Sequence, residues 1–282
     1  TSSIKKPTKI IKNNGLKGFT INILNKITEN NIDILSDKLI DYIKNKNEKN
    51  EMEIVATTIL EKVWYDKGFY ELYIKICEKI WNCKVCKIPY TIHEKQGKYD
   101  CTEFYYSLFT NSKMYGPYNN KKELENYIQN NVNFKTILII LCKDHFCKRN
   151  IFINELQKEK DQNIQYKLKR KIFGTIQLLG YMYKLHHISE DIIHYILLSL
   201  LHSDSITQKG CLYEEEIEAS KLLWNIVSDL FSKEEKEEYI RLFTKELTKW
   251  SPRIRFMVED IISNSSTNIK EFVGKKIVKK LT

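Results

Sequence analysis

Glycine and proline are scarce in this chain, with nine glycines and four prolines among 282 residues. Sheet-rich folds need many tight turns, and tight turns draw heavily on these two residue types. Apolar residues recur instead at helical spacing along nearly the whole chain, and no strand pattern is evident. The composition therefore excludes a turn-rich β architecture and predicts an all-α fold.

Signals for membrane insertion or secretion are also missing from the sequence. No apolar run approaches the ~20 residues that span a bilayer, and no signal-peptide pattern is found near the N-terminus. The seven cysteines are scattered, and we expect reduced thiols. These absences predict no membrane partner and a cytoplasmic or nuclear location, of which we favour the cytoplasm. Because the chain begins with Thr1 rather than Met, we expect a piece of a longer protein.

Motifs for common enzyme classes are absent too. The chain has no GxxxxGKS/T loop, no GxGxxG and no GxSxG elbow. His186 and His187 adjoin Glu190 and Asp191, but these two carboxylates suit the positive end of a following helix. The sequence therefore predicts a protein that is not an enzyme and needs no cofactor.

The clearest structural signal is a helical hairpin between Lys169 and Leu201. Each half carries an apolar stripe at spacings of three and four residues, and Ser189 is placed to cap the second helix. The stripes are formed by Ile172, Ile176, Leu179 and Tyr183, and by Ile193, Ile196, Leu197, Leu200 and Leu201. Each stripe needs a partner to cover it, and the two helices cover one another.

Similar helix pairs follow one another at a period typical of helical repeats. The start of one pair at Lys169 and of the next at Glu214 lie about 45 residues apart, as in HEAT or armadillo repeats. Further helix signals are a capping box at Ser232 and Glu235 and a proline, Pro252, at a first helical position. We predict a right-handed solenoid of about five antiparallel helical hairpins.

The predicted organisation has three parts and one insertion. Residues 1–18 are expected to be a flexible lead-in, residues 19–263 the repeat domain, and residues 264–282 a basic C-terminal tail. Residues 82–133, rich in tyrosine, interrupt the pattern after the second hairpin. Within this insertion we expect helices at Thr102–Phe109 and Lys121–Gln129.

One cysteine-containing group has the residue types of a zinc site. Cys83, Cys86, His93 and Cys101 offer thiolates and an imidazole, which are the ligands of tetrahedral zinc. Their spacing matches no strong zinc-finger signature, so a set of half-buried thiols is the favoured interpretation. Cys142, His145 and Cys147 form a second group, for which we expect core packing.

The chain has a formal net charge of +10. A basic surface attracts polyanions, although lysines that merely solvate helix backs explain the charge equally well. Two basic clusters stand at expected helix starts, where cations oppose the helix dipole. The clusters are Lys167, Lys169, Arg170 and Lys171, and Lys249, Arg253 and Arg255. A phosphate backbone or an acidic protein surface would suit them, and we expect RNA contact at the first cluster.

Several of these segments, taken in order, resemble a known family. They are Leu24-Asn25-Lys26-Ile27-Thr28, Ile59–Val63 with Phe69, Tyr73 and Cys77, Asn133-Phe134-Lys135 with Leu141, Cys142 and Phe146, Lys171–Leu185 with Gly174 and Gly180, Ile193-His194, and Arg253–Ile261. Together the chain resembles the middle domain of eukaryotic translation initiation factor 4 gamma, from about residue 19 to residue 262.

The resemblance implies a non-catalytic crescent of five HEAT-like hairpins. Such a scaffold binds the DEAD-box initiation helicase and mRNA, holds the two helicase lobes half-open, and stimulates unwinding for ribosome recruitment. Other subunits of the cap-binding complex would bind outside this fragment. The helicase contacts carry over to Arg253, Arg255 and Phe256, and to Asn25 and Lys26. Leu24, Ile254 and Met257 are expected in the core, and Gly174 and Gly180 at close contacts between repeats.

The chain departs from the family pattern in two places. The 82–133 segment is longer than usual, and the charged linker before Lys169 is shorter than in many members. Related domains also act in mRNA decay, splicing and nuclear cap binding. A helical-repeat adaptor in one of those processes is therefore the alternative function.

Overall fold

The structure, a computed structural model, describes residues 15–46, 51–83, 90–104, 115–131, 133–202, 213–245 and 250–263. The chain divides into two compact units, Thr1–Leu141 and Cys142–Thr282. We refer to them as the first and the second unit. The division falls inside helix α6 (Phe134–Cys147).

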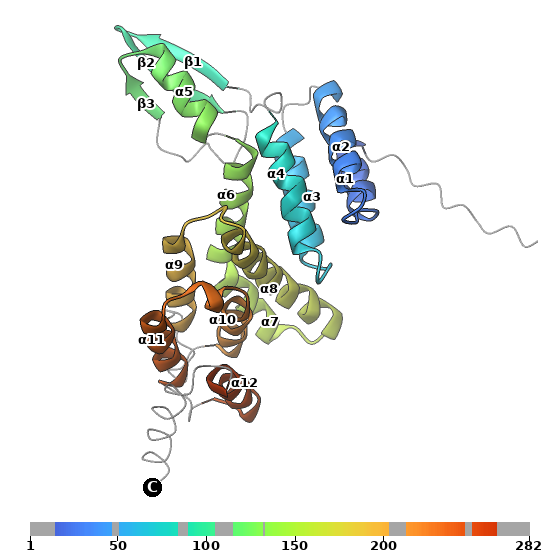
Figure 1. The fold of residues 1–282 in the computed structure, drawn as a ribbon, viewed down its shortest axis with the longest axis vertical. Helices are drawn as coiled ribbons and strands as arrows, with labels where there is room; N and C mark the ends of the chain where they lie inside the picture. The colour runs from blue at the N-terminus through green and yellow to red at the C-terminus, as the bar shows by residue number, and fades with distance from the viewer. Residues whose placement is uncertain are drawn as a thin grey trace, which may run out of the picture. The chain divides into compact units, whose positions relative to one another are not determined.

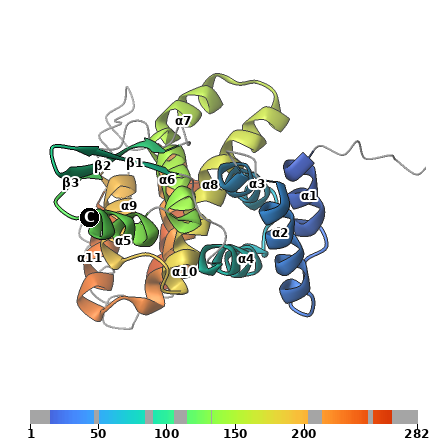
Figure 2. The ribbon, with the colours of Figure 1, turned by 90° about the horizontal axis from the view of Figure 1, so that it is seen from above.

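The first unit starts with four helices: α1 (Gly15–Leu24), α2 (Ile32–Lys46), α3 (Glu51–Val63) and α4 (Tyr70–Asn82). α1 packs on α2 and α3, and α4 packs on α2 and α3 (Figures 1 and 2). Their apolar stripes meet in a core that includes Leu16, Leu39, Val55, Ile59 and Tyr73. α1 begins earlier than the predicted domain start at residue 19. The rest of the predicted lead-in lies outside the described residues.

The insertion contains a small sheet, so the prediction that strands are absent is wrong. Strands β1 (Tyr90–Lys95), β2 (Lys98–Phe104) and β3 (Tyr115–Tyr118) pair antiparallel in the order β1-β2-β3. The helix predicted at Thr102–Phe109 is wrong as far as Phe104, where the chain is in β2, and residues 105–109 lie outside the described ranges. The second predicted helix is confirmed as α5 (Lys121–Asn131), which packs on β2 and β3 (Figure 1).

The regular elements among the described residues of the second unit are all helices. After the end of α6 come α7 (Arg149–Lys158), α8 (Gln162–Lys184), α9 (Glu190–Leu201), α10 (Glu214–Val227), the short 3-10 helix η2 (Ser228–Leu230), α11 (Lys233–Thr244) and α12 (Pro252–Ser263). α8 packs on α7, α9 and α10, while α10 also packs on α9 and α12. α10 is therefore the element on which most of this unit is assembled.

The two helices predicted between Lys169 and Leu201 are confirmed as α8 and α9, with three corrections. They do not chiefly cover one another, because α8 packs mainly on α10 and α7. α8 starts at Gln162, where the Asp161 side chain accepts the Asn163 N–H at 2.7 Å. Ser189 occupies the cap position of α9, but its side chain makes no cap hydrogen bond. In the turn between α8 and α9, the backbone of His186 adopts the left-handed conformation, with φ 61°.

The other predicted helix signals of the second unit are confirmed. Ser232 Oγ accepts the Glu235 N–H at 3.2 Å, and the Glu235 carboxylate accepts the Ser232 N–H at 2.7 Å, which completes the capping box. Pro252 is the first residue of α12. Gly180 is a close-contact position as predicted, because a Cβ there would lie 2.8 Å from Leu223 Cδ1 of α10.

A buried ion pair joins the start of α7 to the first turn of α10. Arg149 Nε lies 3.3 Å from Glu216 Oε1, and the two side chains are 11% and 0% exposed. The guanidinium also donates to the carbonyls of Phe146 and Ser199 and lies 4.4 Å from the Phe146 ring centroid. Because Glu216 stands in the first turn of its helix, the helix dipole also favours its negative charge.

The chain is mostly helical, as the composition indicates, while the handedness and the number of hairpins stay predictions. In the part of the chain that the structure describes, no helix has the length and apolar character to cross a bilayer. The predicted basic tail, residues 264–282, lies outside the described ranges.

Candidate protein-binding surface on α12

α12 has one buried face and one face turned to solvent. Ile254, Val258, Ile261 and Ile262 are buried, at the three-to-four-residue spacing of a core-facing stripe. On the other face Arg255 is exposed and Phe256 is 67% exposed. That fraction exceeds those of the other exposed large apolar side chains of the described residues. An exposed aromatic beside an arginine has the composition of a protein-binding hot spot.

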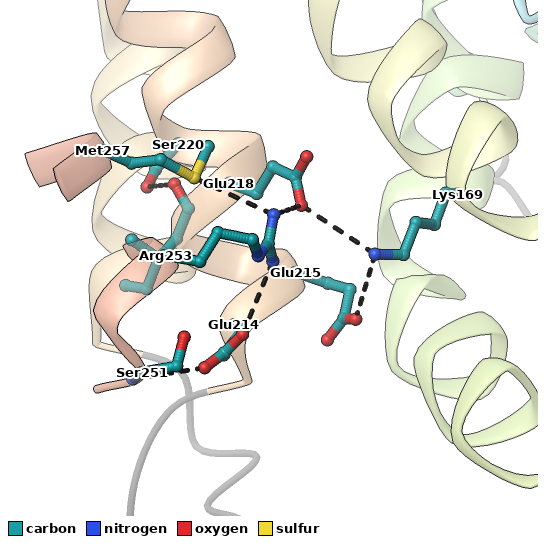
Figure 3. Close-up of polar contacts among 9 residues, drawn as sticks. Lys169, Glu214, Glu215, Glu218, Ser220, Ser251, Arg253 and Met257 are labelled. Atoms are coloured by element: carbon teal, nitrogen blue, oxygen red, sulfur yellow. Dashed lines mark hydrogen bonds and ion pairs between the residues drawn. The ribbon is translucent and has the colours of Figure 1, made fainter. Parts of the chain in front are cut away.

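The N-terminus of α12 is fixed to α10 by ionic contacts, which Figure 3 shows. Arg253 Nη1 donates to Glu218 Oε2 at 2.9 Å, and Nη2 donates to Glu214 Oε2 at 3.5 Å. Glu214 also accepts the Ser251 N–H at 3.3 Å. Arg253 therefore anchors its own helix, and its guanidinium is already engaged within the chain.

The charge of Arg253 is stabilised by this arrangement. Partial burial alone would lower the pKa of the guanidinium. Its hydrogen bonds to Glu218 and Glu214, and their negative charges, outweigh that effect and raise the pKa. A cation at a helix start is unfavourable because it opposes the helix dipole. The two glutamates offset this unfavourable interaction from within the chain, whereas the sequence suggested an external partner for this role.

Glu218 links this cluster to α8. Its Oε2 lies 3.9 Å from Lys169 Nζ, which also lies 3.5 Å from Glu215 Oε1 (Figure 3). The acidic start of α10 thus contacts one cation from α8 and one from α12. Farther along α12, Lys221 Nζ lies 2.8 Å from Asp260 Oδ2. These contacts orient α12 so that Arg255 and Phe256 point away from the core.

The four residues predicted to bind RNA differ in exposure. They lie inside α8, several residues beyond its start at Gln162, so they do not oppose its dipole in the first turn as we expected. Lys167 is exposed and Lys169 is engaged as described above. Arg170 is 4% exposed, and Lys171 lies over the Phe152 ring at 5.5 Å.

The residues predicted for the N-terminal helicase contact lie in the turn between α1 and α2. Asn25 and Lys26 are exposed. Asn31 closes the turn, because its side chain donates to the Lys26 carbonyl at 2.9 Å and accepts the Thr28 N–H at 2.7 Å. Leu24 is buried, as expected.

The predicted zinc ligands are not assembled by the described residues. Cys83 is half-buried at the C-terminal end of α4, and Cys86 lies outside the described ranges. In the sheet, Cys101 pairs with Ile92, whereas His93 pairs with Asp100.

Core packing, predicted for the second cysteine group, is confirmed for Cys142 only, because His145 is half-buried and Cys147 is exposed. Cys142 is buried, and burial raises the pKa of its thiol to about 12, so the thiolate that metals bind is disfavoured. His145 stacks on Phe152 with ring centroids 6.0 Å apart. Cys147 is exposed at the end of α6.

Two groups of residues were missed by the sequence reasoning. Glu214 and Glu218 lie 39 and 35 positions from Arg253, and a single sequence carries no signal for such a pairing. Glu190, His194 and Glu235 also come together in the fold. The spacing of four between Glu190 and His194 was the one available hint, because such residues share a helix face.

Comparison with known families agrees with this architecture. The sequence profile of the MIF4G domain matches residues 19–268, which is most of the chain. The chain belongs to the MIF4G domain family. This profile and the initiation-factor relatives described next together confirm the resemblance to the middle domain of eukaryotic translation initiation factor 4 gamma.

Individual relatives of this MIF4G domain are initiation factors. The chain is 25% identical to eukaryotic translation initiation factor 4 gamma of Dictyostelium discoideum, over 92% of this chain and 19% of the relative. It is 22% identical to eukaryotic translation initiation factor 4G of Cucumis melo, over 85% of this chain and 11% of the relative. It is 27% identical to eukaryotic translation initiation factor 4 gamma 3 of Homo sapiens, over 47% of this chain and 9% of the relative. The chain thus spans at most about a fifth of the length of these relatives.

Proposed function

We propose that this MIF4G domain is a non-catalytic scaffold of translation initiation that binds the DEAD-box initiation helicase. The exposed face of α12, with Arg255 and Phe256, forms one contact. The turn with Asn25 and Lys26 forms the other. The domain also contacts mRNA and works in the cytoplasm. Membership in the family and the similarity to initiation factors support this assignment.

The proposed mechanism is preorganisation of the helicase. A scaffold that binds both lobes of a two-lobed enzyme favours the arrangement in which both contacts are made, and it shifts the population toward that arrangement. The two proposed contacts lie in different units of the chain, Asn25 and Lys26 in the first and the α12 face in the second. Each contact can therefore be removed without altering the fold around the other.

The observation that carries the proposal is the exposure of Phe256. An aromatic side chain that is 67% exposed on an otherwise well-packed helix gains no core stabilisation. Buried against a partner, it would contribute apolar area at low conformational cost, since it has only two rotatable side-chain bonds. Arg255 beside it supplies a charge for an acidic partner surface.

Phe256→Ala is expected to weaken helicase binding by ~10-fold or more, because truncating a hot-spot aromatic costs ~2 kcal/mol or more. Calorimetric titration against the purified initiation helicase measures this loss. The matched control is Ile151→Ala, which removes another exposed apolar side chain, 55% exposed, on α7. Helical circular dichroism should be unchanged in both variants. Equal affinities of Phe256→Ala and the unaltered protein would rule out this surface.

Arg255→Glu is the informative charge reversal at this surface. Arg253→Glu would also break the contacts with Glu214 and Glu218, so its effect would mix binding with anchoring of α12. Stimulation of the helicase ATPase by the domain should fall in Arg255→Glu. Absence of stimulation by the unaltered domain would favour an adaptor in mRNA decay, splicing or nuclear cap binding.

RNA contact is expected to depend on Lys167 more than on its three predicted neighbours. Lys167 is exposed, whereas Lys169 is engaged with Glu215 and Glu218 and Arg170 is buried. Lys167→Ala should weaken binding of single-stranded RNA regardless of its sequence and lower the salt-dependence slope by ~1. Fluorescence anisotropy at several salt concentrations measures both. Lys160→Ala, which removes an exposed lysine just before α8, is the control. An unchanged slope in Lys167→Ala would place RNA elsewhere.

A further inference from the structure

A cluster in the second unit, apart from the proposed helicase contacts, has the residues and spacing of a metal site. Glu190 and His194 lie one turn apart on α9, and Glu235 comes from the first turn of α11. His194 Nε2 lies 3.2 Å from Glu235 Oε1 and 3.7 Å from Glu190 Oε1. One possible ligand atom from each residue lies within 4.8 Å of those of the other two.

The imidazole is held so that Nε2 faces both carboxylates. His194 Nδ1 lies 2.5 Å from the Tyr239 hydroxyl, and its ring stacks on Phe231 with centroids 5.2 Å apart. It also lies parallel to the Tyr239 ring at 5.8 Å. A hydrogen bond on the nitrogen remote from the ligand position fixes the ring orientation of metal-binding histidines in the same manner.

The two carboxylates are also positioned by neighbouring groups. Glu235 uses Oε2 for the N–H of Ser232, which leaves Oε1 toward His194. Glu190 Oε1 accepts the Tyr183 hydroxyl at 3.2 Å. The site is therefore preorganised from two helices and needs no large rearrangement to take a ligand.

The local field is negative and favours a cation. Two of the three candidate ligands are carboxylates, and Glu238 stands on α11 three residues after Glu235. The side chains of Glu190, His194 and Glu235 are 49%, 26% and 34% exposed, so an ion can enter from solvent.

We propose that Glu190, His194 and Glu235 bind a divalent transition-metal ion of the zinc type and so fasten α9 to α11. Tetrahedral zinc at ~2.0–2.1 Å from nitrogen and oxygen ligands holds neighbouring ligand atoms about 3.3 Å apart. The observed separations of 3.2 and 3.7 Å bracket that value. Three protein ligands leave a fourth position for water. This assignment goes beyond the scaffold function and does not depend on it.

The proposal is tested by titrating the full chain with Co²⁺, followed by displacement with Zn²⁺. We expect one Co²⁺ whose visible absorption indicates nitrogen and oxygen ligands without thiolate. Any Co²⁺ held by cysteines gives an intense thiolate charge-transfer band in the near ultraviolet and is counted separately. Zn²⁺ should also raise the melting temperature of the unaltered protein, because it binds only the folded state.

Four variants separate the site from general effects of charge. His194→Gln should lose the thiolate-free Co²⁺ spectrum and the Zn²⁺-dependent rise in melting temperature. Glu235→Gln preserves the capping box, which accepts Gln at this position, and should weaken binding at least tenfold. Tyr239→Phe keeps the ring and should weaken binding by ~10–100-fold. Glu238→Gln removes one charge from the same helix without removing a ligand and should bind normally.

The opposite results would overturn the proposal. They are equal binding by His194→Gln and the unaltered protein, Co²⁺ bound only with the thiolate band, or no Co²⁺ bound by the folded unaltered protein. In each of those cases the three side chains form a hydrogen-bonded ion cluster between α9 and α11. If His194→Gln fails to fold, Co²⁺ binding by Glu235→Gln is compared with that by Glu238→Gln. Weaker binding by Glu235→Gln supports the metal site, and equal binding supports the ion cluster.

Discussion

Glu216→Leu is expected to lower the free energy of unfolding of the second unit by ~3–5 kcal/mol. The substitution leaves the Arg149 guanidinium, 11% exposed, without the carboxylate that lies 3.3 Å from its Nε. The carbonyls of Phe146 and Ser199 still accept from it, but they do not balance its charge. Denaturant unfolding followed by far-UV circular dichroism and tryptophan fluorescence measures the loss.

Two further variants show whether charge is the cause. Glu216→Gln keeps the side-chain volume and an acceptor oxygen, so its cost should fall between those of the leucine variant and the unaltered protein. Arg149→Met with Glu216→Leu removes both charges and should recover much of the stability, because a buried ion pair replaced by apolar groups is often neutral. A loss below ~1 kcal/mol for Glu216→Leu would mean that the pair is effectively solvated.

Gly180→Leu is expected to destabilise the same unit by ~1–3 kcal/mol or more through overpacking. Even a bare Cβ at Gly180 would lie 2.8 Å from Leu223 Cδ1 and 3.3 Å from Ile226 Cδ1. Leu223 is fully buried and has little freedom to move aside. A larger side chain must therefore push α8 and α10 apart, and the same unfolding measurement would show a lower transition midpoint.

The alanine variant at this position calibrates the effect. Gly180→Ala should gain about 1 kcal/mol of helix preference, and this gain offsets the shift required of the Leu223 methyl group. Gly180→Leu combined with Leu223→Ala returns volume to the contact and should recover part of the loss. If Gly180→Leu were as stable as the unaltered protein, the close approach of the two helices would not be required.

Much of the fold was predictable because helical signals are local. The capping box at Ser232 and Pro252 at the start of α12 each depend on residues a few positions apart, and both are confirmed. The early start of α8 was missed, because Leu168 is the one buried residue among its first seven and gives no periodicity. Asp161, which caps that helix, was the available signal.

The strands were missed for a different reason. β1 and β2 join through Gln96 and Gly97, with φ of 53° and 69°, which is the left-handed pair of a two-residue hairpin turn. A Gly in the second of two turn positions predicts such a hairpin most strongly after Asn or Asp, and here it follows Gln. Because glycine is scarce in the chain as a whole, the single glycine of this turn, Gly97, was not recognised as a hairpin signal.

The candidate binding surface was predictable in part. The exposure of Arg255 and Phe256 agrees with the expectation taken from the resemblance. The internal engagement of Arg253 was not predictable, because its partners lie on α10 and pair with it only after α10 and α12 pack. A cation at a helix start indicates a missing anion, but the sequence cannot say whether that anion is internal or external.

The central place of α10 has a consequence for how the protein is made. The main contacts of the second unit join helices that are neighbours or next neighbours along the chain, and such short-range topologies fold quickly. A chain emerging from the ribosome can therefore complete α8, α9 and α10 before α12 has been synthesised. α12 then docks onto acidic groups already in place at Glu214 and Glu218. The face with Arg255 and Phe256 is accordingly among the last parts of the described structure to form.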